Sequence, residues 1–178
     1  ADVINHLAIA TLATLCSESG SKLIHISTDY VFDGSSPVAY TETDLPSPKS
    51  VYGLTKLAGE TACLKNCTES IIIRTAWVYS EFGNNFVKTM LRLMSERESL
   101  GVVNDQVGSP TYAADLAQVI MTIIDSGQWA SGIYHYSNAG EISWYDFAND
   151  IKEIGGKTCD IKGIPASSYP TPAERPAY

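Results

Sequence analysis

Apolar residues recur along this chain first with helical spacing and then with the spacing of short strands. Residues 2–19 carry many apolar side chains without an interrupting Pro or Gly, which predicts a helix buried on most of its surface and ended by Gly20. Residues 22–27 and 70–74 read as strands, and the second of these is a run of β-branched residues. Such a run is typical of a parallel strand covered on both faces.

The alternation continues toward the C-terminal end. Helices are predicted at residues 51–66, 85–98, 113–126 and 144–154, with strands at 100–103 and 132–137. A loop rich in Pro, Ser and Thr fills residues 33–50. Helices and strands alternate at the lengths expected of crossover units, so the prediction is an α/β fold with a mostly parallel sheet and flanking helices.

Length and charge narrow the classes of protein that fit. The chain has 178 residues, of which 44% are hydrophobic and 18% charged, as is typical of a globular protein. Its net charge of −8 argues against a nucleic-acid-binding protein, because phosphate binding needs a basic face. No apolar run is long enough to span a bilayer and no signal peptide is recognisable, so we expect no membrane partner.

The cysteines indicate the redox state of the cellular compartment in which the protein works. Cys16, Cys63, Cys67 and Cys159 are scattered and form no C-x-x-C pair. A disulfide scaffold would be denser, and a zinc site would need Cys or His at ligand spacing. We therefore expect reduced thiols, no metal-binding residues and a cytoplasmic location.

One pair of residues has the chemistry of an acid–base catalyst. Tyr52 and Lys56 stand one turn apart in a predicted helix, which puts both side chains on one face. A free tyrosine has a pKa of about 10, and a neighbouring ammonium lowers it toward the range that acid–base catalysis requires. By itself, the pair fits a solvated helix face as well.

Polar residues at the end of the strand over residues 22–27 favour the catalytic reading. Thr28 and Asp29 follow that strand directly, and open α/β sheets bind ligands at this edge. A loop with Glu42 and Asp44 then leads to the helix that carries Tyr52.

Four longer strings extend the pattern: STDYVFDG, YTETDLPSPKSVYGLTKLAGE, RTAWVYSEFGNNFVKTML and VNDQVGSPT. As a set, they resemble the extended branch of the short-chain dehydrogenases/reductases, and within it the dTDP-4-dehydrorhamnose reductase family. The resemblance runs from Asn5 to Pro176. It implies an NADPH- or NADH-dependent oxidoreductase that converts dTDP-4-dehydro-L-rhamnose to dTDP-L-rhamnose, and it leaves Mg²⁺ and a homodimer open.

The resemblance also implies roles for the catalytic residues. Tyr52 would donate the proton to the 4-keto oxygen as hydride arrives from the nicotinamide. Lys56 would hold the nicotinamide ribose hydroxyls and lower the pKa of Tyr52. Thr28 would hydrogen-bond the same sugar oxygen and tune the proton transfer.

Three further residues are implied to bind the substrate. Asp29 would contact the sugar, and Trp77 would form a wall of the sugar pocket. Asn85 would contact the diphosphate at a helix N-terminus, although an asparagine there is also a common helix cap.

The fold implied by the resemblance is a partial Rossmann-like sheet followed by a smaller substrate-binding portion. Residues 1–80 would form the C-terminal half of the Rossmann-like domain, and residues 81–178 would add further Rossmann elements and the substrate-binding portion. The glycines include no dinucleotide fingerprint. We therefore expect the glycine-rich half to precede Ala1, and we expect the chain to be inactive by itself.

Other residues have plainer interpretations. Asn5 matches a helix asparagine of such enzymes, but equally a polar residue near a helix start. His25 is read as a core histidine, Asp115 as a capping residue, and Trp144 and Tyr145 as anchors of the last helix.

Two alternative functions remain open. One is a nucleotide-sugar epimerase or dehydratase of the same branch, which would share Tyr52 and Lys56. The other is a non-catalytic regulatory subunit that resembles the methionine adenosyltransferase β subunit.

Overall fold

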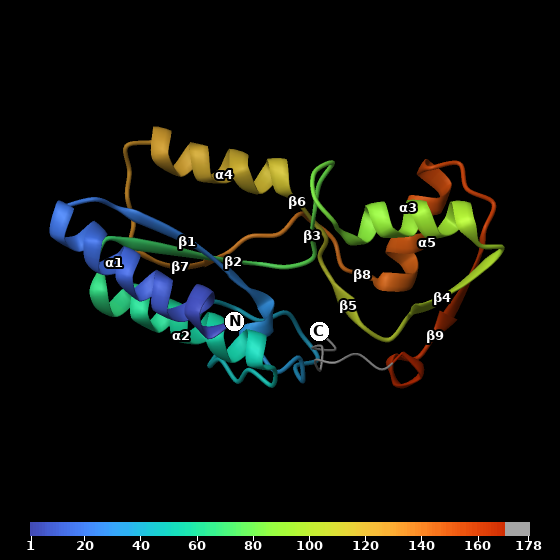
Figure 1. Cartoon of the computed structure of the whole chain (residues 1–178), viewed down its shortest axis with the longest axis horizontal. Helices are drawn as coiled ribbons and strands as arrows, with labels where there is room; N and C mark the ends of the chain where they lie inside the picture. Colours follow the sequence, from blue (N-terminus) through green and yellow to red (C-terminus); the bar gives the residue numbers. More distant parts are fainter. Residues whose placement is uncertain (170–178) are drawn as a thin grey trace.

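The computed structural model describes residues 1–169, and residues 170–178 lie outside that description. The described chain forms two lobes side by side (Figure 1). One lobe is a parallel sheet between helices. The other is smaller and contains α3 (Phe86–Glu96) and α5 (Trp144–Ile154). The predicted α/β fold, with a mostly parallel sheet and flanking helices, is confirmed.

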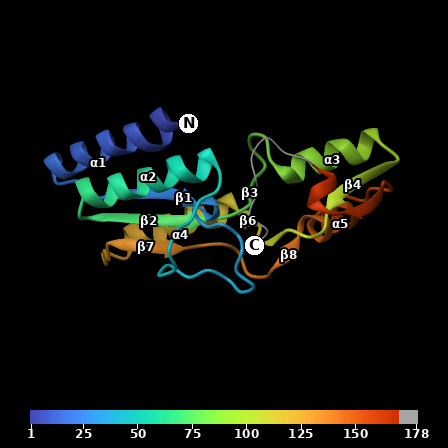
Figure 2. The ribbon, with the colours of Figure 1, turned by 90° about the horizontal axis from the view of Figure 1, so that it is seen from below.

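The sheet of the larger lobe has the order β1-β2-β7, and all of its pairings are parallel. Its strands are β1 (Leu23–Thr28), β2 (Ser70–Thr75) and β7 (Gly132–His135). Helices α1 (Ala8–Ser19) and α2 (Val51–Asn66) cover one face, and α4 (Ala113–Asp125) covers the other (Figure 2). Central β2 is buried along its whole length, as its β-branched run predicts.

The smaller lobe is built on a second pair of parallel strands. β4 (Ser99–Val103) pairs with β9 (Asp160–Ile164), and α3 and α5 pack beside them. Their core combines sulfur-containing, aliphatic and aromatic side chains: Met90, Met94, Leu100, Val102, Phe147, Ala148, Ile151, Cys159 and Ile161. A capping box between Ser143 and Asp146 begins α5.

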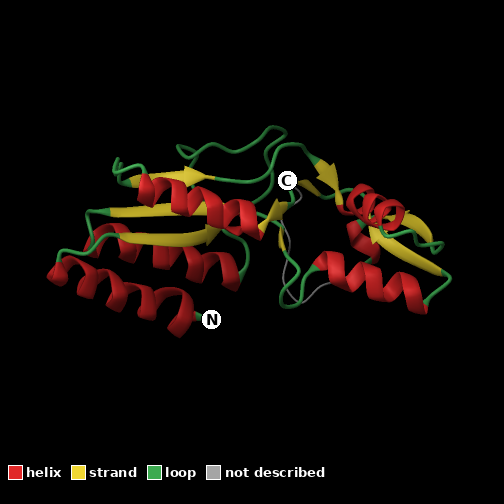
Figure 3. Ribbon diagram, turned by 90° about the horizontal axis from the view of Figure 1, so that it is seen from above, coloured by secondary structure: helices red, strands yellow, loops and turns green. Residues whose placement is uncertain are grey.

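Short strand pairs lie where the two lobes meet (Figure 3). β3 (Val78–Tyr79) pairs in parallel with β6 (Thr111–Tyr112), and β5 (Val107–Gly108) pairs antiparallel with β8 (Ile142–Ser143). The chain therefore crosses between the lobes several times, and the division at residues 80 and 81 stays a prediction.

The sequence analysis was wrong about the first helix. Among the residues of α1 only Ala13 is buried, whereas Leu12 and Leu15 are about half exposed. Residues Val3–Leu7 form a π-helical turn instead of the start of an α-helix. Its many apolar residues predicted burial of most of its surface, but α2 is the main element packed against it.

Shorter elements were missed for a different reason. The strand pairs β3–β6 and β5–β8 have two residues in each strand, too few for a periodic pattern to be recognised. Strand β9 was not predicted. In the part of the chain that is described, no helix combines the length and apolar character needed to cross a bilayer.

Two glycines let α2 approach its neighbours closely. A Cβ atom at Gly59 would lie 2.1 Å from the backbone oxygen of Asn5 in the π-helical turn. A Cβ atom at Gly53 would lie 2.1 Å from the backbone oxygen of Tyr30. Both neighbours are backbone atoms, so neither can move aside without shifting a whole segment. Glycine at these positions seats α2 against the N-terminal turn and the end of β1.

We expect Gly59→Ala to destabilise the chain by about 1–3 kcal/mol, the usual cost of overpacking. The reason is the clash with Asn5, which outweighs the better helix propensity of alanine. Urea unfolding followed by circular dichroism measures the change. Thr61→Ala, on the exposed face of the same helix, serves as the control. Equal stability of the two variants would contradict the close packing.

Candidate active site

The C-terminal end of β1 forms a short polar turn. Asp29–Val31 make one 3-10 turn that begins at Thr28. The Thr28 hydroxyl donates to Asp29 Oδ1 at 2.8 Å and accepts from the Tyr30 backbone N–H at 3.3 Å. Thr28 is buried, so this network holds its hydroxyl in a defined place at the sheet edge.

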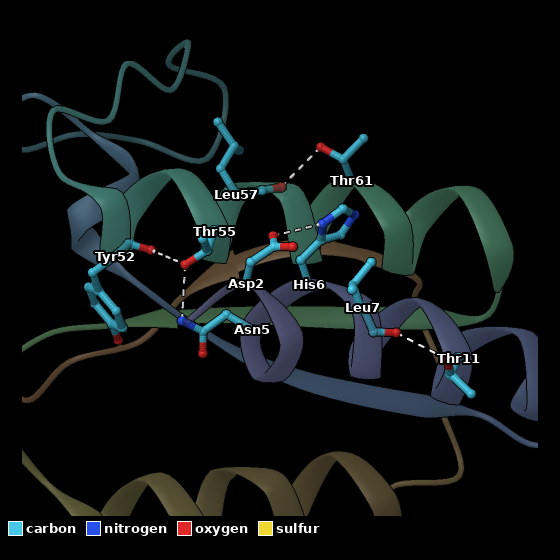
Figure 4. A network of polar contacts seen from close by, with 9 residues as sticks. All are labelled: Asp2, Asn5, His6, Leu7, Thr11, Tyr52, Thr55, Leu57 and Thr61. Atoms are coloured by element: carbon cyan, nitrogen blue, oxygen red, sulfur yellow. Dashed lines mark hydrogen bonds and ion pairs between the residues drawn. The ribbon is translucent and has the colours of Figure 1, made fainter.

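Tyr52 lies in the first turn of α2, directly after the helix cap formed by Ser50. Its ring contacts Tyr30 edge to face, with centroids 5.5 Å apart. The residue remains 43% exposed, which leaves its side chain within reach of a ligand. The backbone oxygen of Tyr52 accepts from Thr55, and Thr55 accepts from Asn5 Nδ2 at 3.1 Å (Figure 4). Asn5 therefore connects the π-helical turn to the helix of Tyr52.

The pKa of Tyr52 differs from the sequence interpretation. Burial raises this pKa, Asp29 raises it further, and a hydrogen bond with Thr28 opposes the shift. The Lys56 ammonium, one turn along α2, donates to the Ile26 backbone oxygen at 2.6 Å. Burial also lowers the pKa of Lys56. Tyr52 is therefore a protonated phenol at neutral pH, which is the form that a proton donor needs.

Asp29 is the acidic group nearest to this pair. Burial raises its pKa to about 6, although hydrogen bonds from Thr28 and the backbone act in the opposite direction. Its carboxylate is thus partly desolvated and lines a cleft at the ends of β1, β2 and β7. Near neutral pH it is available as a hydrogen-bond acceptor for a ligand in that cleft.

A buried ion pair lies beneath the site. Arg74, in β2, donates from Nε to Glu60 Oε1 at 3.0 Å and from Nη2 to Glu60 Oε2 at 2.7 Å. Both side chains are almost fully buried. Glu60 stands one turn after Lys56, so Tyr52, Lys56 and Glu60 follow one another along the same side of α2.

The cleft itself has a volume of about 150 Å³. Arg74 and His135 line it, as does Phe32, whose ring stacks on Tyr40 with centroids 4.3 Å apart. Burial lowers the pKa of His135. Sequence reasoning missed both Arg74 and His135, although an arginine that ends an apolar strand signals a buried partner.

Trp77 lies beside this cleft in an aromatic stack. Its indole stacks on Trp144 at 3.4 Å between centroids, and its φ of 49° is in the left-handed region. A Cβ atom at Gly108 would lie 2.8 Å from the Trp77 indole, so glycine lets these two segments of the chain approach each other closely. Gly108 also lines the cleft. The stack joins the end of the sheet to the last helix, as the anchoring role of Trp144 predicted.

Asn85 caps α3 and makes its hydrogen bonds locally. Its Oδ1 accepts from the Lys88 backbone N–H at 3.2 Å, and its Nδ2 donates to the Ser80 backbone oxygen at 2.7 Å. These bonds match the capping interpretation. A diphosphate contact at this helix N-terminus stays a prediction.

The contacts of the other residues singled out in the sequence fit structural roles. His25 is buried, its pKa is lowered to about 4 by burial and then by Lys56, and its Nε2 has no hydrogen-bond partner. Asp115 lies in the first turn of α4 and accepts from Asn138 Nδ2 at 2.7 Å, without a cap bond of its own. All four cysteines are free.

Metal binding finds no support in the described residues. Across residues 1–169, no group of three or more His, Cys, Asp or Glu side chains is arranged to hold an ion.

Comparison with known proteins gives consistent matches. The family described as "RmlD substrate binding domain" matches residues 1–178. A dTDP-4-dehydrorhamnose reductase of Sinorhizobium fredii is 45% identical over 98% of this chain and 62% of its own length. A dTDP-4-keto-6-deoxy-D-glucose reductase of Streptomyces niveus is 40% identical over 99% of this chain and 61% of its own length.

A solved structure extends the likeness to the fold. The crystal structure of a dTDP-4-dehydrorhamnose reductase from Bacillus anthracis in complex with NADP matches with a TM-score of 0.95 and 42% identity. The match covers 100% of this chain and 62% of that one. The chain thus spans somewhat less than two thirds of the length of these relatives.

The buried ion pair yields a stability prediction. We expect Glu60→Gln to lower the free energy of unfolding by about 3–5 kcal/mol, because it leaves the Arg74 charge buried without a counter-ion. Glu96→Gln removes the exposed pair between Glu96 and Arg92 and should cost about 0–1 kcal/mol. Urea unfolding of both variants measures the difference. Similar costs would show that the Glu60 pair does not hold α2 to β2.

Asp29 yields a prediction about pH. Its raised pKa means that the folded chain binds a proton more tightly than the unfolded chain does. The free energy of unfolding therefore falls as the pH rises from the ordinary aspartate pKa near 4, and the full loss is present above about pH 6. Asp29→Asn should therefore be more stable than wild type by about 1–3 kcal/mol at neutral pH. The advantage should shrink as pH falls through about 6 toward the ordinary aspartate value near 4.

Asp33→Asn is the control, and its expected effect on the free energy of unfolding is opposite to that of Asp29→Asn. Hydrogen bonds from Ser35 and Tyr40 lower the pKa of the partly exposed Asp33 to about 2. Asp33→Asn should therefore destabilise the chain at neutral pH. Urea unfolding at several pH values tests both variants. A stability gain of Asp29→Asn that is independent of pH would count against the desolvated carboxylate.

Proposed function

The chain belongs to the RmlD substrate-binding domain family, and we propose that it carries the proton donor and the sugar-binding surface of an NAD(P)H-dependent nucleotide-sugar reductase. Its substrate is dTDP-4-dehydro-L-rhamnose, and its product is dTDP-L-rhamnose. The observation that carries the proposal is the meeting of Tyr52, Thr28 and Asp29 at the C-terminal edge of β1. Relatives from Sinorhizobium fredii and Bacillus anthracis bear the name of this reductase.

Tyr52 supplies the proton in this proposal. The nicotinamide cofactor, when bound, supplies the hydride that reduces the C4 carbonyl carbon. The carbonyl oxygen takes its proton from the Tyr52 hydroxyl, which is protonated at neutral pH because burial raises its pKa. Thr28, whose interaction with Tyr52 opposes the rise of the Tyr52 pKa, would contact the same oxygen.

The residues at this edge fit the nicotinamide end of the cofactor. Lys56 has three ammonium hydrogens, one of which is directed to the Ile26 backbone oxygen. The other two are donors of the kind that ribose hydroxyls accept. After proton transfer, the positive charge of Lys56 would stabilise the Tyr52 phenolate. The binding of the remainder of the cofactor is not assigned to this chain, which has no glycine fingerprint.

The sugar-binding surface continues from Asp29 to Trp77 in the proposal. Asp29 accepts hydrogen bonds from sugar hydroxyls through its partly desolvated carboxylate. Trp77 presents its indole beside Gly108, in line with an aromatic wall against a sugar ring. The Streptomyces niveus relative is named for a 4-keto sugar as well, which supports reduction at C4 as the shared chemistry.

The reductase is favoured over both alternatives. An epimerase or dehydratase of the same branch would share Tyr52 and Lys56, but relatives at 40–45% identity are named as reductases. A non-catalytic subunit has no need for a half-exposed tyrosine backed by a threonine and a desolvated carboxylate. The cytoplasmic location and a homodimer remain predictions.

The test uses the chain fused to the part of the Sinorhizobium fredii relative that it does not cover. We expect Tyr52→Phe to lower kcat of this fusion with NADPH or NADH by about 10²–10⁴-fold, because the phenyl ring keeps its packing but has no proton to donate. KM for dTDP-4-dehydro-L-rhamnose should change little. Steady-state kinetics provides both values.

Tyr134→Phe is the matched control. Tyr134 is exposed on β7, and its hydroxyl donates only to the nearby Ala130 backbone oxygen. Its removal should leave kcat unchanged. A Tyr52→Phe fusion that retains near-normal kcat would overturn the role of Tyr52. The 178-residue chain alone should be inactive in the same assay.

A further inference from the structure

A long irregular segment crosses the carboxyl ends of the strands in the larger lobe. Residues 34–49, here called the strap, contain neither helix nor strand. The strap leaves the end of β1, reaches β7 and returns to the start of α2, and Figure 2 shows it beside the chain of β7. Because the strand order is β1-β2-β7, it passes the end of β2 on the way. Irregular loops of this length are uncommon in compact domains, and many of them are lids or binding loops.

The outer edge of β7 is where the strap is fastened. The Tyr136 backbone N–H donates to the Arg74 oxygen in β2 at 2.9 Å. Successive N–H groups of a strand point to opposite sides, so the N–H of His135 points away from β2. In the described sheet no further strand lies on that side. Glu42 Oε1 accepts from this N–H at 2.9 Å and so takes the place of a strand partner.

The turn that carries Glu42 is braced internally. Asp44 Oδ2 accepts from the Thr41 backbone N–H at 2.6 Å and from the Thr41 hydroxyl at 3.0 Å. These bonds shape the turn but do not attach it to the sheet. The hydrogen bond from the His135 N–H holds the pKa of Glu42 below its usual value, so the bond is charge-assisted at neutral pH. Among the described hydrogen bonds of residues 41–45, it is the one that reaches the sheet.

The strap also supplies one wall of the cleft. Ala39 and Tyr40 line the cleft, and the ring of Tyr40 stacks on Phe32. The Tyr40 hydroxyl donates to Asp33 Oδ1 at 2.8 Å. Phe32 in turn meets the ring of His135 edge to face, with centroids 5.7 Å apart. The residue that holds Glu42 therefore also borders the aromatic stack that the strap completes.

We propose that Glu42 is a positioning residue that latches the strap to the outer edge of β7, and that its release moves Ala39 and Tyr40 away from the cleft. The Ser47 N–H donates to the Val31 oxygen at 2.9 Å and ties the returning part of the strap to the end of β1. The outer part can then move while both ends stay in place. The latch is a property of this chain, whereas its effect on a nucleotide sugar rests on the proposed function.

Proton NMR of the 178-residue chain tests the latch. The ring signals of Tyr40 report its stack on Phe32, a contact in which Glu42 takes no part. We expect Glu42→Ala to shift these signals toward those of an exposed tyrosine. Exchange of the His135 amide should become about threefold to tenfold faster, as expected for the loss of one hydrogen bond. Glu42→Gln keeps an acceptor oxygen and should lie between the wild type and Glu42→Ala.

A matched control removes a carboxylate elsewhere. Glu153 is exposed on α5 in the smaller lobe, and Glu153→Ala should change neither the Tyr40 signals nor the exchange of the His135 amide. Unchanged Tyr40 signals in Glu42→Ala would overturn the latch. A Glu42→Gln chain that is as open as Glu42→Ala would overturn it too, because the hydrogen bond would then not be what holds the strap.

Kinetics of the fusion with the Sinorhizobium fredii portion tests the effect on the ligand. We expect Glu42→Ala to raise KM for dTDP-4-dehydro-L-rhamnose about threefold to tenfold, because the open strap retains the ligand less well. The value of kcat should stay nearly the same, since Tyr52 keeps its place on α2. Glu42→Gln should restore most of the loss. A wild-type KM in the Glu42→Ala fusion would show that the strap does not retain the ligand.

The latch and the proposed function fail in different ways. If Glu42→Ala frees Tyr40 in the chain but the wild-type fusion does not turn over dTDP-4-dehydro-L-rhamnose, the latch stands and the reductase proposal fails. If the fusion is active while Glu42→Ala alters neither the Tyr40 signals nor KM, the reductase stands and the latch is wrong.

Discussion

The buried ion pair between Glu60 and Arg74 is the interaction on which the candidate site depends. Both charges lie away from water, and each is tolerated only because the other is present. Glu60 belongs to α2, and Arg74 to the central strand β2, so the pair fixes the height and rotation of α2 on the sheet. Tyr52 and Lys56 are carried on the same helix and take their positions from that alignment. Gly53 and Gly59 then allow the helix to approach the end of β1 and the N-terminal turn.

The same alignment separates two kinds of chemistry at the sheet edge. On the side of α2, Tyr52, Thr28 and Lys56 are suited to proton transfer, because burial keeps the phenol protonated and the ammonium lies one turn away. On the side of β7, Nη1 of Arg74 and Nε2 of His135 are buried without a hydrogen-bond partner. Asp29 belongs to both sides, since it accepts from Thr28 and lines the cleft.

The second lobe contributes mainly through aromatic contacts. Trp77 leaves the end of β2 with a left-handed backbone, and its indole lies flat against Trp144 at the start of α5. Stacked rings of this kind add to the stability already gained by burying their surface. Phe86 and Phe147 extend the aromatic contact into the lobe's core. Trp77 is therefore packed against the aromatic core of the smaller lobe.

The sequence alone determined the elements whose signals are local. The bounds of α2 and α5, the buried run of β2 and the polar turn after β1 follow from caps, periodicity and β-branching within one segment, and so does the joint face of Tyr52 and Lys56. Only the tertiary structure decided the contacts between distant segments. The Glu60–Arg74 pair, the neighbouring Arg74 and His135, and the stack of Trp77 on Trp144 depend on strand order and register, which no local pattern specifies. Lys56 illustrates the limit: its spacing from Tyr52 was evident, but the fold directs its ammonium to the backbone of β1, and burial raises the pKa that its charge was expected to lower.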